Sequence, residues 1–192
     1  GGASLGELAI LNRLCRERCE TWCLLMNCEM ENIIPRIGFG GGCHWCTEAV
    51  FQSVRGVSQT EQGLIRSEPP CDNWSEAVVV HYDEAEISLK PLVEIHLRTH
   101  ASTSGHSMRG KYRSAIYTFT ADQQEAVRDI LTGLQAGFDE ELVTQILPFA
   151  GFRASDQRFH NYYAQGPERP FCQSYIDPKL RLLRAQFSKY AR

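Results

Sequence analysis

The pattern of hydrophobic and polar positions alternates between strand-like and helix-like segments along most of the chain. Short apolar runs bounded by turn residues predict strands at residues 33–39, 57–65, 77–82, 112–119 and 142–149. Apolar residues at helical spacing predict helices at residues 43–54, 88–99, 121–137 and 179–190. Ser88 and Thr120 stand at the starts of two of these helices, where a hydroxyl can accept an unpaired backbone N–H. Because strands and helices alternate without a parallel-barrel repeat, we expect an α+β fold, a two-layer sandwich around a mixed sheet.

Residues 1–29 differ from the rest of the chain. Apolar residues recur there at helical spacing with charged residues between them, which predicts an amphipathic helix. The segment from Met30 onward, MENIIPRIGFGGG, has the character of the start of a compact domain. We therefore interpret residues 1–29 as an extension outside the main fold, and residues 30–192 as one domain.

Four cysteines of this extension recur at intervals of four, four and five residues: Cys15, Cys19, Cys23 and Cys28. Three of them would share one face of a helix, a spacing compatible with a metal or redox site. We favour a plainer interpretation, in which the cysteines form a thiol-rich apolar face packed on the domain. A stretch that is not native to the protein is the other plain interpretation.

Composition and charge narrow the classes of function. The chain has 192 residues, 43% hydrophobic and 22% charged, as in a soluble globular protein. Its formal charge of −3 gives no electrostatic reason to expect nucleic acid or an acidic membrane as partner. No apolar run approaches the roughly 18 residues of a membrane span, and charged residues interrupt the apolar core that a secretion signal requires. We therefore expect a cytoplasmic protein whose cysteines serve reactivity, metal binding or packing before structural disulfides.

The most informative feature is the segment GGGCHWCTE at residues 40–48. A glycine turn follows a predicted strand, and a helix begins at or next to Cys43. The unpaired N–H groups and the positive end of the helix dipole favour a thiolate there, and Cys46 completes a C-x-x-C pair. Both cysteines could instead be small buried residues, but three glycines in a row are a poor choice for mere packing. A zinc site would need a second such pair, and none follows downstream.

This segment resembles the GCFW(G/C)-x-E-x-x-F motif of the peptide methionine sulfoxide reductase A family. The resemblance continues in GV at residues 56–57, EAVVVHYD at 76–83, ISL at 87–89, TH at 99–100, KYRSAI at 111–116, FHNYY at 159–163, PFC at 170–172 and PKLRLLRAQF at 178–187. Members whose motif reads GCFWC have a similar tail. The resemblance spans about residues 30–192 and implies the family's ferredoxin-like core.

By resemblance, the chain reduces methionine S-sulfoxide, free or in proteins, and so repairs oxidative damage. In this reaction a thiolate attacks the sulfoxide sulfur, the oxygen is protonated, and a cysteine sulfenic acid is left. Cys43 matches the attacking thiol, and Glu76 matches the acid that serves the oxygen, which requires a carboxyl of raised pKa. Trp45 matches the aromatic wall for the S-methyl group, and Tyr112 matches a second donor to the oxygen. Taken alone, these three residues could equally be an exposed carboxylate, a core tryptophan and an ordinary strand tyrosine.

A second thiol is expected to condense with the sulfenic acid to a disulfide, which an external dithiol then reduces. Cys172 matches the recycling cysteine of the family's tail, whereas Cys46 must meet disulfide geometry within one helical turn. We expect Cys172 to resolve the sulfenic acid with Cys46 as a relay, although either could be an idle core thiol. The resemblance implies thioredoxin as reductant and no bound cofactor or metal, and we expect a monomer.

The sequence departs from the family pattern around the site. The family's phenylalanine after the nucleophile is His44, its GY-x-GG tyrosine falls at Leu64, and its aspartate before the conserved tyrosine is Ser107. The loop at residues 64–75 is shortened and lacks the family's NP-x-Y sequence. These changes keep the thiol, the carboxyl and the tryptophan but remove an aromatic hydroxyl and a carboxylate. His44 and His106 are candidates for replacement substrate-binding donors, or else ordinary loop residues.

Two other functions compete with methionine sulfoxide reduction. One is a reductase that the altered pocket narrows to a different small sulfoxide. The other is a protein without turnover, which binds oxidised methionine or senses thiol redox state. Cys43, Glu76 and Cys172 argue against a pure binder, since binding alone needs neither thiol. A thioredoxin-like oxidoreductase is disfavoured, because its C-x-x-C pair occurs without a tail cysteine or a YRS segment.

Overall fold

The structure, a computed structural model of the chain, describes residues 34–192. The N-terminal extension expected from the sequence, with its cysteines, lies outside the described residues, so its interpretation stays a prediction. Within residues 34–192, no helix is both long enough and apolar enough to cross a membrane.

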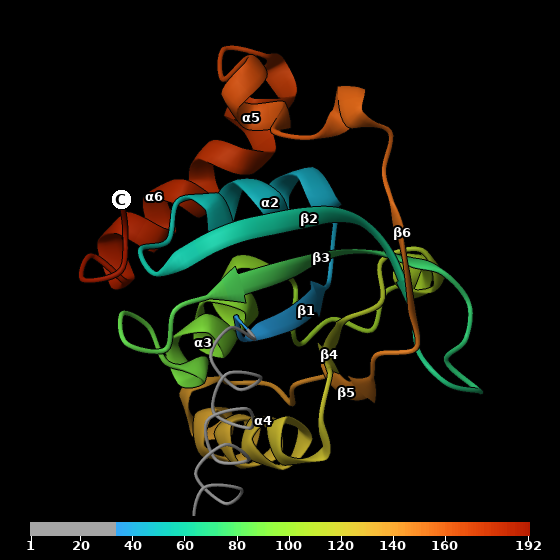
Figure 1. Cartoon of the computed structure of the whole chain (residues 1–192). Coiled ribbons are helices and arrows are strands. Elements are labelled where there is room, and N and C mark those ends of the chain that lie inside the picture. Colours follow the sequence, from blue (N-terminus) through green and yellow to red (C-terminus); the bar gives the residue numbers. More distant parts are fainter. Residues whose placement is uncertain (1–33) are drawn as a thin grey trace, which may run out of the picture. The chain divides into compact units, whose positions relative to one another are not determined.

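A six-stranded mixed sheet forms the centre of the described fold (Figure 1). Its strands are β1 Arg36–Gly40, β2 Val57–Arg66, β3 Ser75–Tyr82, β4 Ala115–Thr118, β5 Gln145–Pro148 and β6 Gly151–Ala154. They lie in the order β5-β4-β1-β3-β2-β6. Neighbouring strands are antiparallel except β4 and β5, which run parallel. The strand that leads into the glycine turn, β1, is therefore held by a neighbour on each side.

Helices pack on one face of this sheet and bury the larger core. The α-helices are α2 His44–Gln52, α3 Leu89–Thr99, α4 Ala121–Leu134, α5 Tyr162–Gln165 and α6 Asp177–Gln186. Phe39, Val78 and Val80 point from the central strands into the core that these helices share. Ala77 and Val79 point to the opposite face, where a second and smaller core forms. This alternation follows from the period of two in a strand, and it confirms the predicted α+β class with a mixed sheet.

The predicted elements occur, and their ends differ in detail. Thr120 caps α4 as predicted, since its side chain accepts the N–H of Gln123 at 3.1 Å. Ser88 occupies the N-cap position of α3, but its side chain makes no capping hydrogen bond, so that part of the prediction is wrong. β4 begins only at Ala115, which leaves Tyr112 in the loop before the strand.

Hydrophobic periodicity does not reveal the shortest elements. β6, α5 and the 3₁₀ turn Ser107–Gly110 have four residues each, and the π-helical turn Cys172–Ile176 has five. These four segments mix apolar and polar residues, so they lack the apolar run that reveals the equally short strands β4 and β5. The π-helical turn leads directly into α6, so the last helix begins earlier than the periodicity predicts.

Candidate active site

Cys43 occupies the N-cap of α2, directly after the glycine turn that ends β1. Its carbonyl oxygen accepts the N–H groups of Cys46 and Thr47, with N···O distances of 3.1 and 3.3 Å. The helix therefore begins where the sequence predicts. The turn requires glycine at position 41, because a Cβ there would lie 2.4 Å from the ring of His100 at the end of α3. This close approach fixes the backbone that carries the Cys43 thiol.

The thiol of Cys43 is paired with the thiol of Cys46, one helical turn along. A hydrogen bond with Cys46 lowers the pKa of Cys43 to about 7, against the opposing effect of burial. The backbone N–H of Trp45 and the charge of protonated His44 act in the same direction. The same hydrogen bond, together with burial, raises the pKa of Cys46. Above neutral pH the pair therefore holds a thiolate at Cys43 and a thiol at Cys46.

Alkylation of Cys43 should follow the population of this thiolate. We expect the rate constant with iodoacetamide to rise with pH and to level off above a midpoint of about 7, because the thiolate is the reactive form. In Cys46→Ala the hydrogen bond is lost, and the midpoint should move to higher pH. Peptide mass spectrometry of Cys43 labelling at a series of pH values measures both midpoints. A wild-type midpoint of about 8.5, as for a free cysteine, would contradict the expectation.

Glu76 lies on β3 with its carboxylate against the first residue of α2. Its Oε2 accepts the backbone N–H of His44 at 3.2 Å and lies 2.9 Å from Nδ1 of the His44 ring. The Nζ atom of Lys111 lies 3.4 Å from Oε1. Burial raises the pKa of Glu76, but the hydrogen bonds and charge of His44, with Lys111, outweigh burial and bring the pKa below its ordinary value. The raised pKa expected from the sequence is wrong, because His44 supplies a partner that an apolar site would lack.

Leu64 is the cross-strand neighbour of Glu76, since the two residues pair directly between β2 and β3. An aromatic hydroxyl at position 64 would therefore stand next to this carboxylate, and here an apolar side chain takes its place. Ser107 is exposed in the 3₁₀ turn that precedes Tyr112. The carboxylate of Glu76 thus has His44 and Lys111 as polar partners, and no tyrosine beside it on β2.

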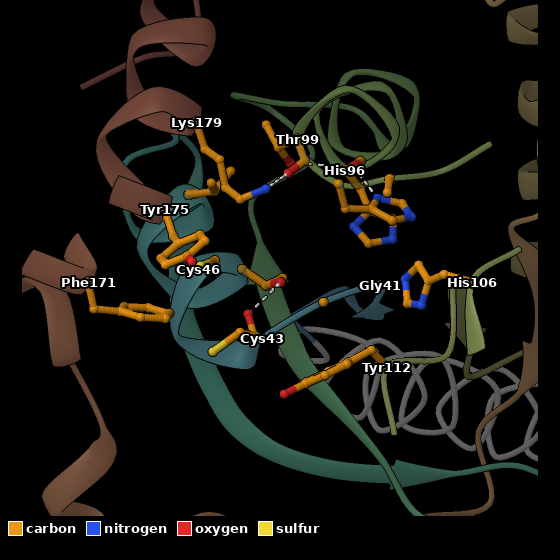
Figure 2. A pocket seen from close by; sticks show the side chains of 15 residues that line it. Gly41, Cys43, Cys46, His96, Thr99, His106, Tyr112, Phe171, Tyr175 and Lys179 are labelled. Carbon is orange, nitrogen blue, oxygen red and sulfur yellow. Dashed lines mark hydrogen bonds between the residues drawn. The ribbon is translucent and has the colours of Figure 1, made fainter. Parts of the chain in front are cut away.

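A pocket of about 510 Å³ opens beside Cys43 (Figure 2). The glycine turn, α2, the end of α3, the loop before β4 and the C-terminal segment contribute to its walls. Cys43, Cys46, Tyr112 and His106, four of the residues predicted from the sequence, lie in this lining. In Figure 2 the ring of Tyr112 extends toward Cys43. The lining is mostly apolar, with Phe171 among its aromatic residues.

Trp45 and Cys172 do not belong to this lining. Trp45 stacks on Tyr162 with ring centroids 4.1 Å apart, and it meets the pocket residue Phe171 edge-on at 5.4 Å. Cys172 has an exposed fraction of 0% at the first residue of the π-helical turn, and burial raises its pKa. Trp45 therefore supports one wall from behind. The thiol of Cys172 reaches solvent only if the π-helical turn opens.

Several residues at the site escape reasoning from the sequence. The guanidinium of Arg109 donates to the carbonyl oxygens of Gly41 and Tyr112, at 3.3 and 3.1 Å, and so ties the loop before β4 to the glycine turn. His96 and His100 stack with centroids 4.1 Å apart and line the pocket, and burial lowers the pKa of both. Their spacing of four on a predicted helix was the available signal. Arg109 and Lys179 carry no signal, because single basic residues are usually solvated.

The arrangement is suited to sulfur chemistry. A thiolate lines a pocket, a second thiol contacts it, and a carboxylate–imidazole pair stands at the same helix start. Such a group can attack a soft electrophile and then store the oxidation as a disulfide. In the part of the chain that the structure describes, no group of three or more His, Cys, Asp or Glu side chains is arranged to hold a metal ion.

Known proteins resemble this chain in sequence and in fold. The family described as "Peptide methionine sulfoxide reductase" matches residues 35–191. The peptide methionine sulfoxide reductase MsrA of Deinococcus radiodurans is 33% identical over 165 residues, which cover 78% of this chain and 80% of that protein. Methionine sulfoxide reductase A of Corynebacterium diphtheriae gives a TM-score of 0.58 at 26% identity, covering 69% of this chain and 74% of that one. Mxr1 from Saccharomyces cerevisiae, solved in complex with Trx2, shares the fold with a TM-score of 0.54 at 19% identity, covering 66% and 84%.

Proposed function

The chain belongs to the peptide methionine sulfoxide reductase family, and on that premise we propose that Cys43 is the residue at which it reduces methionine S-sulfoxide. The observation that carries this proposal is the thiol itself. Cys43 lines a pocket, stands at the start of a helix and has a pKa of about 7. Such a thiol is a thiolate, the nucleophilic form, at and above neutral pH. Oxidised methionine, free or in proteins, is the substrate.

The first step transfers the oxygen. The Cys43 thiolate attacks the sulfoxide sulfur and forms a transient sulfur–sulfur bond. The oxygen then moves to the Cys43 sulfur as this bond and the sulfur–oxygen bond of the substrate both break. One proton is taken up, so methionine leaves in its reduced form and Cys43 becomes a sulfenic acid. The apolar walls of the pocket, with Phe171 and the supporting Trp45, suit the S-methyl end of the substrate.

We assign the proton to the pair formed by Glu76 and His44. By itself, the carboxyl of Glu76 is ionised at neutral pH and has no proton to donate, because its pKa is lowered. Nδ1 of His44 lies 2.9 Å from Oε2 of Glu76 without an aligned hydrogen bond, so a small rotation of the ring lets the two groups share one proton and deliver it to the leaving oxygen. Tyr112 supplies a second hydrogen bond to that oxygen, and His106 contacts the substrate from the rim of the pocket.

We propose that Cys46 resolves the sulfenic acid first and that Cys172 follows. Cys46 lies one helical turn from Cys43 and lines the same pocket, whereas Cys172 is fully buried outside that lining. A charge on Cys172 would affect the pKa of Cys46, so these two thiols are also near each other. A disulfide between Cys43 and Cys46 then passes to Cys46 and Cys172 by thiol–disulfide exchange, which frees Cys43. This order reverses the expectation from the sequence.

The remaining proposals concern the reductant, the cellular compartment, the oligomeric state and the extent of the catalytic domain. Thioredoxin is the external dithiol, in a reducing cytoplasm, and the chemistry needs no prosthetic group because thiols supply both electrons. We propose that the enzyme acts as a monomer. Residues 1–29 lie outside the catalytic fold, which agrees with a family match that begins at residue 35.

One observation favours a second candidate within the same chemistry. Leu64 beside Glu76 removes a hydroxyl that would bind the sulfoxide oxygen, so the pocket is less polar there. A small sulfoxide whose substituents are more apolar than those of methionine sulfoxide would lose less binding free energy from this change. The chain then reduces such a sulfoxide faster than the methionine compound. Binding without turnover, or thiol sensing alone, has no comparable support.

Turnover of the two diastereomers of a methionine sulfoxide peptide tests the proposal. With dithiothreitol as reductant, the wild-type protein should reduce the S form and leave the R form. We expect this selectivity because only one face of the sulfoxide sulfur is open to the thiolate when the oxygen points to its proton donors. Chiral chromatography of the remaining substrate measures both rates. Reduction of the R form, or of neither form, would overturn the proposal, and faster reduction of a dialkyl sulfoxide would favour the second candidate.

A further inference from the structure

Lys179 is the one lysine or arginine among the residues that line the pocket in the described part of the chain. It reaches the pocket from α6, and its Nζ donates a hydrogen bond to the carbonyl oxygen of Thr99, the last residue of α3 (Figure 2). Its ammonium group forms no ion pair with any carboxylate of residues 34–192. The pocket therefore contains one positive charge without a fixed negative partner.

An ammonium group in a mostly apolar pocket is unfavourable unless an anion accompanies it. Burial accordingly lowers the pKa of Lys179. The lining contains no carboxylate, and the group in it that ionises closest to neutral pH to give an anion is the thiol of Cys43. Both thiols raise the pKa of Lys179 when they are charged. The natural partner of this lysine is thus a cysteine thiolate.

We propose that Lys179 is a positioning residue that holds Cys46 as a thiolate during the second step of the reaction, when Cys43 is a sulfenic acid. The inference rests on the proposed function, in which Cys46 is the first resolving thiol. The geometry behind it is the shared pocket, in which Lys179 and both cysteines line the same cavity. The Thr99 carbonyl restrains the ammonium group there, since it accepts a hydrogen bond from Nζ.

The need for such a residue follows from what changes between the two steps. In the reduced enzyme, the hydrogen bond with Cys43 and the charge on Cys43 raise the pKa of Cys46 and keep it protonated. When Cys43 becomes a neutral sulfenic acid, both influences end. Burial still opposes ionisation of Cys46, and the charge of Lys179 favours it. Lys179 is then the charged group of the pocket that favours a negative charge on Cys46.

The second step then balances without any further reactant. The Cys46 thiolate attacks the sulfur of the Cys43 sulfenic acid, an S–S bond forms, and the S–O bond breaks. The oxygen leaves as hydroxide and becomes water with one proton. Cys43 is reduced from the sulfenic to the disulfide level while Cys46 is oxidised to it. Lys179 takes no part in the bonds that change, and it acts through the charge of Cys46.

A single-turnover experiment separates the two steps. Reduced protein is mixed with one equivalent of methionine S-sulfoxide without external reductant, quenched by alkylation, and analysed for methionine and for linked cysteine peptides. In Lys179→Met, methionine should form at nearly the wild-type rate, while the Cys43–Cys46 disulfide should form about tenfold more slowly, as for a shift of one pKa unit in Cys46. The pH dependence of that step should move to higher pH, and Lys179→Arg should restore both. Lys90→Met, an exposed lysine of α3, is the matched control.

The outcomes distinguish this inference from the proposed function. No methionine from the wild-type protein would overturn the proposed function. The role of Lys179 would be overturned, and the proposed function kept, if Lys179→Met formed methionine normally and then formed the disulfide with the wild-type rate and pH dependence. A first disulfide between Cys43 and Cys172 would also overturn it. Slow disulfide formation in Lys179→Arg as well as Lys179→Met would show a structural role and contradict the inference.

Discussion

Replacing Cys43 by serine should remove turnover of methionine S-sulfoxide, with a loss in kcat on the order of 10³-fold or more, as when a nucleophile is deleted. A serine hydroxyl stays protonated at neutral pH, and its oxygen cannot accept the sulfoxide oxygen as sulfur does. The variant should fold normally, because Cys43 is partly exposed at the N-cap and its side chain makes no capping hydrogen bond. Methionine release from the peptide substrate with dithiothreitol measures the loss.

Cys71→Ser is the matched control for this variant. Cys71 is also a free, partly exposed cysteine, and it lies in the loop between β2 and β3, outside the pocket. Its replacement should leave kcat within about twofold, since surface substitutions away from a site have small effects. After one turnover, a sulfenic-acid probe such as dimedone should label Cys43 in a Cys46→Ser, Cys172→Ser double variant, in which neither proposed resolving thiol is present. Labelling elsewhere, with activity retained in Cys43→Ser, would refute the assignment of the nucleophile.

Glu76→Gln should lower kcat about 10²- to 10⁴-fold, the range for loss of a general acid. The amide keeps the shape of the side chain, but it cannot hold the proton that Glu76 shares with His44. The matched control is Glu61→Gln, because Glu61 of β2 forms a second carboxylate–histidine pair, with His81, outside the pocket. That variant should keep kcat within about twofold. Steady-state rates between about pH 5 and 9 give both numbers.

His44→Phe then shows how the proton is held. Without the imidazole, burial acts on Glu76 with less opposition, so the pKa of Glu76 should rise. The carboxyl would itself be the acid, protonated below its pKa, and activity should fall as the pH rises through that value. In the wild-type protein the shared proton should extend activity to higher pH. A pH profile of kcat unchanged by His44→Phe would contradict the paired donor.

The contribution of the sequence is clearest at the nucleophile. GGGC at the end of an apolar run predicts a strand, a glycine turn and a helix start, and the structure contains each of them. These features are local, because they depend on residues within a few positions of one another. The same holds for the Thr120 cap, whose donor lies three residues away. The family motifs add predictions for residues far apart in the sequence, because they assign expected roles to Glu76 and Tyr112.

The pKa of Glu76 is a property of the site that local sequence patterns do not predict. Its pKa depends on His44 and Lys111, which are 32 and 35 positions away in the sequence. They meet Glu76 because β3 lies beside the start of α2 and because the loop before β4 accepts the N–H of Glu76 at the Lys111 carbonyl. The raised pKa was expected because the role of an acid requires it, and the contacts with His44 and Lys111 give the opposite direction. The effect of Leu64 on the site also depends on the tertiary structure, because Leu64 is the cross-strand partner of Glu76.

The strand, glycine turn and helix start at Cys43, the α+β class and the order of the main elements were predicted from the sequence alone, because they depend on local patterns of residues. The tertiary structure decided which groups surround that thiol. It brought Lys179 from α6 and Tyr112 from the loop before β4 to one pocket, and it buried Cys172. Charges and burial act through space, so a residue more than a hundred positions away along the chain can change the chemistry of a neighbour in the fold.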